Sequence, residues 1–173
     1  MKTDQQTKYM QLYQPLSRKL SNYCRMLTKN KTQAEDLLHD TILASFGNFE
    51  TLKSEKAFPS FVYSTAYNIY CKELRRKKFR GNYNEQAANF IQDFGADPQT
   101  KAELSIILEK MKKLPQKQYD TMMLYHVADL HMDEIMKIQE ISLATVKQRL
   151  KYGRENLLKL LNEKERRIAL LMF

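Results

Sequence analysis

Turn-forming residues are scarce in this chain, and their scarcity limits the possible folds more than any other feature. The 173 residues include only four glycines and four prolines. A β-sandwich needs many Gly- and Pro-rich turns between short strands, whereas helices exclude both residues from their interiors. Apolar residues make up 43% of the chain, which suffices for a folded core. We therefore expect an all-α protein with one ordinary domain or two small ones.

The distribution of charge divides the chain into three parts. Residues 1–80 carry 15 basic and 7 acidic side chains, and residues 101–173 carry 14 basic and 10 acidic ones. Residues 81–100 carry three acids and no Lys or Arg, and Gly81, Gly95 and Pro98 interrupt them. Such a stretch is typical of a linker. We predict two small helical domains, 1–80 and 102–173, joined by a flexible linker over 81–101.

The formal net charge of +9 favours a polyanionic partner, nucleic acid before a membrane surface. The longest uninterrupted apolar stretch is Ile168–Phe173, far short of the roughly 20 residues that a membrane-spanning helix needs. The first six residues contain no apolar signal core. Two cysteines, Cys24 and Cys71, do not form a secreted disulfide framework. We therefore expect a protein of a reducing compartment such as the cytoplasm.

Catalytic, metal and cofactor sites are not indicated. The four glycines stand too far apart for a phosphate-binding loop. His126 and His131 are five residues apart, which does not align them on one helical face. Asp36, His39 and Asp40 are explained more simply by a charged helix surface than by an acid–base cluster. We expect a protein that is not an enzyme and has neither a cofactor nor a small-molecule substrate.

Helical spacing dominates the first half of the chain. Apolar residues recur at helical intervals from Tyr9 to Leu27, which predicts one helix over this range. Thr32 and Glu35 have the spacing of a capping box, so a second helix is expected to start there and to end at Gly47. A polar connection over 48–56 leads to a third helix over 58–78.

The third helix combines aromatic and basic residues. Tyr63, Tyr67 and Tyr70 recur at helical spacing, which fits either a core face or a binding surface. Residues 72–80 hold six cations in nine positions, more than a helix dipole requires, so phosphate contact is favoured. Aromatic rings beside a basic stripe suit unstacked single-stranded bases. Asn68 lies between them, and its amide can both donate to and accept from the edge of a flipped base.

The second half contains a helix-turn-helix pattern. Helices are expected over 102–113 and 116–127, followed by a short one over 132–139. After a tight turn, Ser142 can cap a longer helix that runs to Leu161. A short helix, a tight turn and a basic helix match the DNA-binding motif, although any helical hairpin can show this pattern by chance. The exposed face of the second helix would show Thr145, Lys147, Gln148, Lys151 and Arg154.

Taken together, these motifs resemble a bacterial sigma-70 family RNA polymerase sigma factor of the extracytoplasmic-function (ECF) type. The resemblance covers roughly residues 9–80 and 102–161. Segment 34–41 resembles the polymerase-binding helix of region 2.2, and segments 58–69 and 74–78 resemble regions 2.3 and 2.4. Segment 114–118 resembles the opening of region 4, and segments 133–135 and 141–150 resemble its helix-turn-helix.

The resemblance implies a protein that binds core RNA polymerase and directs transcription initiation at promoter DNA. The polymerase-binding residues would be Glu35, Asp36 and Asp40, whose alternative is a solvated surface. The pocket for the −10 element would be completed by the loop 48–57 and would include Tyr63, Tyr67, Asn68, Lys72, Arg75, Arg76, Lys77 and Lys78. The −35 element would be bound by Ser142, Thr145, Lys147, Gln148, Lys151 and Tyr152. An anti-sigma factor is a further partner expected by resemblance only.

One alternative interpretation comes from another class of protein. A free-standing helix-turn-helix regulator of duplex operators would explain the second half, but it has no need of the aromatic residues around Asn68. The turn at Glu140 departs from the family pattern, in which Gly is usual, and Met136 and Gln139 replace a usual Ala and Leu. If this turn requires a positive φ, Glu140 is strained there.

Overall fold

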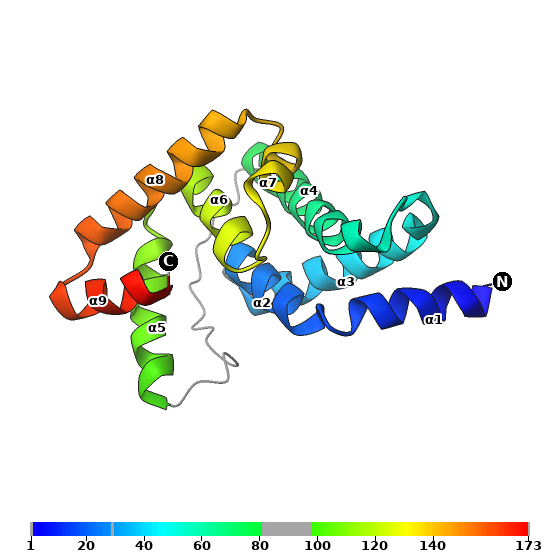
Figure 1. Cartoon of the computed structure of the whole chain (residues 1–173), viewed down its shortest axis with the longest axis horizontal. Coiled ribbons are helices and arrows are strands. Elements are labelled where there is room, and N and C mark those ends of the chain that lie inside the picture. Colours follow the sequence, from blue (N-terminus) through cyan, green and yellow to red (C-terminus); the bar gives the residue numbers. More distant parts are fainter. Residues whose placement is uncertain (1, 29, 81–97, 173) are drawn as a thin grey trace. The chain divides into compact units, whose positions relative to one another are not determined.

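The chain is built from helices, as Figure 1 shows. The structure is a computed structural model that describes residues 2–28, 30–80 and 98–172, and over these ranges every element is an α-helix or a 3₁₀ turn. The helices form two compact units, with α1 to α4 in the first and α5 to α9 in the second. This confirms the predicted all-α fold with two small helical domains. Residues 81–97, which make up most of the predicted linker, lie outside the described ranges.

The first unit is a bundle with two short turns between its last helices. Its elements are α1 (Lys2–Tyr13), α2 (Ser17–Thr28), α3 (Lys31–Gly47), η1 (Phe49–Thr51), η2 (Glu55–Ala57) and α4 (Phe58–Arg80). Helices α2, α3 and α4 pack against one another. Their shared core consists of apolar side chains that are almost completely buried: Leu20, Tyr23, Leu27, Leu37, Val62, Tyr63 and Ala66.

Two sequence predictions about the first unit are wrong. The single helix over 9–27 is two helices, because Pro15 has no N–H to donate and its ring clashes with the carbonyl one turn earlier. The capping box at Thr32 does not start α3. Asn30 does, because its side chain accepts a hydrogen bond from the backbone N–H of Gln33 at 3.1 Å. The predicted end at Gly47 is confirmed.

The second unit contains the helix-turn-helix. Its elements are α5 (Pro98–Met111), α6 (Gln116–His126), α7 (Met132–Gln139), α8 (Leu143–Leu160) and α9 (Glu163–Met172). Helix α5 begins four residues before the predicted start, with Pro98 in its first turn, where a missing N–H is harmless. Helices α6, α7 and α8 pack around buried Met122, Ile135, Val146, Leu150 and Leu157.

The C-terminal helix α9 belongs to the second unit. It packs against α5, and Ala169 is buried. Lys110 of α5 pairs with Glu165, and Lys164 pairs with Glu103 of α5 at 2.9 Å. The apolar C-terminal stretch, for which the sequence suggested no role, thus starts on a helix that is docked on α5.

The turn between α7 and α8 places Glu140 in the left-handed region. Its φ and ψ are 53° and 46°. The backbone N–H groups of Glu140 and of Ile141 both donate to the carbonyl of Met136, which closes α7. The turn therefore does require a positive φ, the condition under which Glu140 is strained, because its Cβ disfavours this conformation.

We predict that Glu140→Gly stabilises the protein by about 0.5–1 kcal/mol, because glycine adopts the left-handed conformation without the steric cost. Glu140→Ala is the matched control, since it removes the same carboxylate and keeps the Cβ. Denaturant unfolding of the three proteins measures the difference. Equal stability of the Gly and Ala variants would contradict the assignment of strain to this turn.

Candidate functional site

The acidic face of α3 is set by the way in which this helix is buried. Its inner side carries Ala34, Leu37, Thr41 and Ser45, all buried. The two buried hydroxyls are satisfied within the helix, since Thr41 donates to the Leu37 carbonyl and Ser45 donates to the Thr41 carbonyl. The three predicted polymerase-binding acids are exposed on the remaining surface: Glu35, Asp36 and Asp40.

An apolar residue on the same face was missed by the sequence analysis. Leu43 is 70% exposed. It lies seven residues after Asp36 and three after Asp40, a spacing that places all three side chains on one side of α3. Consecutive Ile42 and Leu43 made it impossible to tell from the sequence which of the two faces solvent. An apolar side chain beside two carboxylates combines the contact types of a protein-binding surface.

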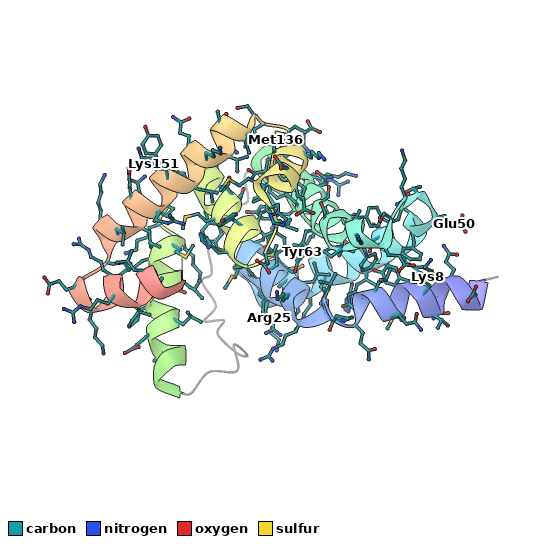
Figure 2. All side chains as sticks on the ribbon, in the orientation of Figure 1. Lys8, Arg25, Glu50, Tyr63, Met136 and Lys151 are labelled. Atoms are coloured by element: carbon teal, nitrogen blue, oxygen red, sulfur yellow. The ribbon has the colours of Figure 1, made fainter. Side chains whose placement is uncertain are left out.

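Helix α4 has a buried face and an exposed face, and the predicted DNA-binding residues are divided between them. Val62, Tyr63, Ala66 and Tyr70 are buried. Tyr63, labelled in Figure 2, packs its ring edge-on against Tyr23 of α2, with ring centres 5.2 Å apart. Of the two interpretations that the sequence left open for this tyrosine, the structure shows the core. The predicted contact between Tyr63 and DNA is therefore not available in this structure, because the side chain is fully buried.

The outer face of α4 carries the other predicted DNA-binding residues. Tyr67 is half-buried, and Asn68, Lys72 and Arg75 are exposed. Positions 68, 72 and 75 are four and three residues apart, so these three side chains form one stripe along the helix. Arg76 is also exposed, and the side chain of Lys78 lies outside the described residues. The structure therefore brings an aromatic ring, an amide and two cations onto one surface.

Some cations of α4 already have partners within the chain. Arg76 pairs with Glu73 at 2.8 Å, and Arg75 donates through Nε to the Cys71 carbonyl at 3.3 Å. Lys77 donates to the side-chain oxygen of Gln33 on α3 at 2.8 Å. Gln33 lies two residues before Glu35, so Lys77 links the basic end of α4 to the start of the acidic face of α3.

The exposed face of α8 depends on the cap and on the packing behind it. Ser142 accepts a hydrogen bond from the Thr145 N–H at 3.1 Å, which starts the helix as predicted. Val146, Leu150 and Gly153 are buried. A Cβ at Gly153 would lie 2.6 Å from the Met122 sulfur, so the glycine permits the close approach of α6.

The predicted −35 residues occupy the first half of α8. Lys147, Gln148, Lys151 and Tyr152 are exposed, and Lys151 projects outward in Figure 2. Ser142 is exposed and Thr145 is half-buried, with their hydroxyl oxygens 2.8 Å apart. The structure thus presents two lysines and a glutamine side by side at the start of the helix, as expected of a DNA-recognition helix.

Gln139 joins three helices of the second unit. Its side-chain oxygen accepts from the Thr121 hydroxyl of α6 at 2.8 Å and from the Arg149 guanidinium of α8 at 3.3 Å. Arg149 is held toward α7 by this bond and does not belong to the exposed stripe of α8. A leucine, the usual residue at this place in the resembling family, could make neither bond.

The described part of the chain contains no group of three His, Cys, Asp or Glu side chains that could hold a metal ion. Burial, with the positive charge of Arg154 nearby, lowers the pKa of His126 to about 4, so this imidazole is neutral at pH 7. Within the described ranges, no helix has the length and apolar character required to cross a membrane.

Comparison with known proteins matches the first unit to a family model and most of the chain to sequence relatives. A family model described as Sigma-70 region 2 matches residues 12–80. The chain is similar to the ECF RNA polymerase sigma factor SigW of Bacillus subtilis, with 27% identity over 159 residues, 84% of each chain. It is also similar to the ECF RNA polymerase sigma factor SigM of the same organism, with 25% identity over 88% of this chain and 94% of the relative.

A solved structure shows the same fold. The sigma factor RpoE of Bartonella quintana, solved with the anti-sigma factor NepR, matches with a TM-score of 0.71 and 18% identity, over 87% of this chain and 96% of RpoE. The sequence relatives extend across both units, and the region 2 match contains the acidic face of α3 and the outer face of α4. Residues 12–80 thus match sigma-70 region 2, and the chain as a whole is similar to sigma factors of the extracytoplasmic-function type.

Proposed function

We propose that this protein is the promoter-specificity subunit of RNA polymerase, which binds the core enzyme and recognises the −10 and −35 elements. The observation that carries the proposal is the outer face of α4. There, exposed Asn68 stands one turn before Lys72 and two turns before Arg75, inside the segment that matches Sigma-70 region 2. A protein that binds only duplex DNA has no need of an amide and an aromatic ring beside a phosphate-binding stripe.

The two units divide the work. Residues 1–80 bind polymerase through Glu35, Asp36, Asp40 and the neighbouring Leu43, and they recognise the −10 element. Residues 102–173 recognise the −35 element through the first half of α8. Residues 81–101 connect them. The opposite charges of the α3 and α4 surfaces support this division, because an acidic face suits a protein partner whereas a basic stripe suits phosphates.

Promoter opening requires no covalent chemistry, so the protein acts as a regulator of transcription and not as an enzyme. The paired and stacked state of the DNA is exchanged for new contacts. Each base stacked on an aromatic side chain contributes about 1–3 kcal/mol. With Tyr63 in the core, Tyr67 is the ring available for this contact, and Asn68 supplies hydrogen bonds to a base edge. Lys72 and Arg75 neutralise phosphates, and polymerase contacts supply the rest.

The protein would act in the cytoplasm on chromosomal DNA, with an anti-sigma factor as a regulator. Support for such a partner comes from RpoE of Bartonella quintana, which has the same fold and was solved with the anti-sigma factor NepR. Reconstitution with core polymerase and mapping of transcript starts tests the proposal directly. A free-standing operator regulator would bind its DNA equally well without the core enzyme and would produce no new start sites.

Asp36→Arg combined with Asp40→Arg is expected to weaken binding to core polymerase about tenfold or more. Two reversed charges add repulsion to the attraction that they remove. Binding is measured by fluorescence anisotropy without DNA. Asp4→Arg with Glu50→Arg makes the same change in net charge outside α3 and is the control. Unchanged affinity in a double variant with normal helicity would show that these acids are a solvated surface.

Asn68→Ala is expected to reduce open-complex formation about tenfold while closed-complex binding stays within about twofold. The amide is proposed to hold a base that becomes available only after unstacking. Permanganate footprinting at matched promoter occupancy measures the difference. Lys72→Ala, one turn away, is the control, because a lost phosphate contact weakens closed and open complexes together. Equal permanganate signal for wild type and Asn68→Ala would make the asparagine a structural residue.

Lys147, Gln148 and Lys151 are expected to read base edges of the −35 element, while Thr145 and Tyr152 hold phosphates. Gln148→Ala and Lys151→Ala should each cost about 1–3 kcal/mol and relax selectivity at one position, because lysine donates to guanine and glutamine pairs with adenine. Selection from randomised −35 libraries measures this.

The matched control for the −35 selection is Lys159→Ala, which removes the same charge near the other end of α8. It should weaken all promoters alike or leave them unchanged. If Gln148→Ala and Lys151→Ala both return the wild-type motif at every position, the helix recognises groove shape or backbone instead.

A further inference from the structure

Helix α1 is attached to the first unit mainly through one buried side chain. Tyr9 is 2% exposed, whereas Lys8, Met10 and Gln11 beside it are exposed. Figure 1 shows α1 extending toward the end of the unit at which α3 passes into the loop before α4. The position of α1 therefore depends on what Tyr9 contacts.

The ring of Tyr9 lies between both ends of the loop 48–57. It makes edge-to-face contacts with three phenylalanines. The distances between ring centres are 5.4 Å to Phe49, 5.4 Å to Phe58 and 5.3 Å to Phe46. Phe46 lies at the end of α3, Phe49 opens η1, and Phe58 is the first residue of α4. One aromatic side chain thus contacts residues at both ends of the loop.

The hydroxyl of Tyr9 fixes how the ring is oriented. It lies 2.7 Å from the Ser45 hydroxyl, and Ser45 donates its own proton to the Thr41 carbonyl at 2.7 Å. Either hydroxyl can donate in the bond between them, and the Tyr9 proton can also be donated to the Ile42 carbonyl at 3.4 Å. Burial raises the pKa of Tyr9, which keeps that proton in place.

A second contact ties α1 to the middle of the loop. Lys8, labelled in Figure 2, pairs with Glu55 of η2 at 2.8 Å. An exposed ion pair adds little to stability, but this one links α1 directly to η2. Tyr9 and Lys8 are consecutive, so the same turn of α1 contacts the loop at both ends and near its middle.

The backbone hydrogen bonds of the loop are local to its two turns, in which Thr51 and Leu52 donate to Asn48 and Phe49, and Ala57 donates to Ser54. Between Phe49 and Phe58, every residue is exposed except Leu52, which is half-buried. A loop that buries so little apolar surface takes its shape from what holds its ends. In this unit, that support is the aromatic group around Tyr9.

We propose that α1 is a clasp that sets the shape of the loop 48–57, and that Tyr9 is a positioning residue for base recognition at the −10 element. The inference rests on the proposed function and on the expectation, from the family resemblance, that this loop completes the −10 pocket. A recognition pocket discriminates between bases only if its walls are held in place. Loosening the clasp therefore reduces base preference and leaves the polymerase-binding face of α3 unchanged.

The test is selection from promoters with a randomised −10 element, transcribed by core polymerase with each variant at equal core occupancy. Tyr9→Leu should reduce the preference at one or more −10 positions roughly threefold to tenfold, and Tyr9→Phe, which keeps the ring contacts, should largely retain it. Lys8→Glu and Glu55→Lys should each shift the preference, and the double variant with exchanged charges should restore it. Gln11→Ala, an exposed change on the same helix, is the control.

Restoration by the exchanged pair separates a clasp from a direct effect of Glu55 on DNA, because a direct effect would persist in the double variant. Unaltered preferences in Tyr9→Leu, with normal core binding, would overturn the inference. If Tyr9→Leu does not fold, the charge variants decide, and unaltered preferences in both single variants would overturn it. A wild-type protein that enriches no −10 motif refutes the proposed function instead, whereas a wild-type motif shared by all variants refutes only the clasp.

Discussion

An α-helix that packs on one side must leave its other side in water, and the first unit depends on this constraint. The inner side of α4 is filled by Val62, Tyr63 and Ala66, which lock it against α2 and α3. That burial determines which residues are left for function. Asn68, Lys72, Arg75 and Arg76 face outward because the apolar residues before and between them face inward. The core therefore positions the functional surface without contributing an atom to it.

The same periodicity explains what could be predicted from the sequence. The bounds of α7 agree with the prediction, because Ile135 and Ile138 lie three residues apart on one face and Ser142 marks the start of the next helix. The cap of α8 at Ser142 was also predictable, because a serine directly before a basic amphipathic stretch is a typical N-cap. Pro15 was overlooked because the apolar spacing continues through it from α1 into α2. Asn30 and Thr32 are both good caps, and only the backbone geometry distinguishes them.

Whether a candidate site residue could be assigned to the surface from the sequence depended on its residue type. Charged residues were placed correctly on surfaces, since a cation or carboxylate is rarely buried without a partner. Tyrosine occurs both in cores and on surfaces, so the sequence could not distinguish Tyr63 from Tyr67. In the structure Tyr63 is fully buried and Tyr67 is half-buried. Leu43 was missed for the opposite reason, because an apolar residue is assigned to the core by default. The role of Tyr9 required contacts over more than thirty residues, which no local pattern reports.

The internal partners of the α4 cations have a consequence for how strongly DNA binding depends on salt. Binding of a polyanion is driven partly by release of the ions condensed on it, in proportion to the phosphates that the protein neutralises. Arg76 and Lys77 are already engaged by Glu73 and Gln33, so a phosphate must replace those contacts. In the proposed complex, Glu73 also keeps a negative charge beside the bound strand. We therefore expect the basic segment 72–80 to bind non-promoter DNA more weakly than its six cations alone would predict.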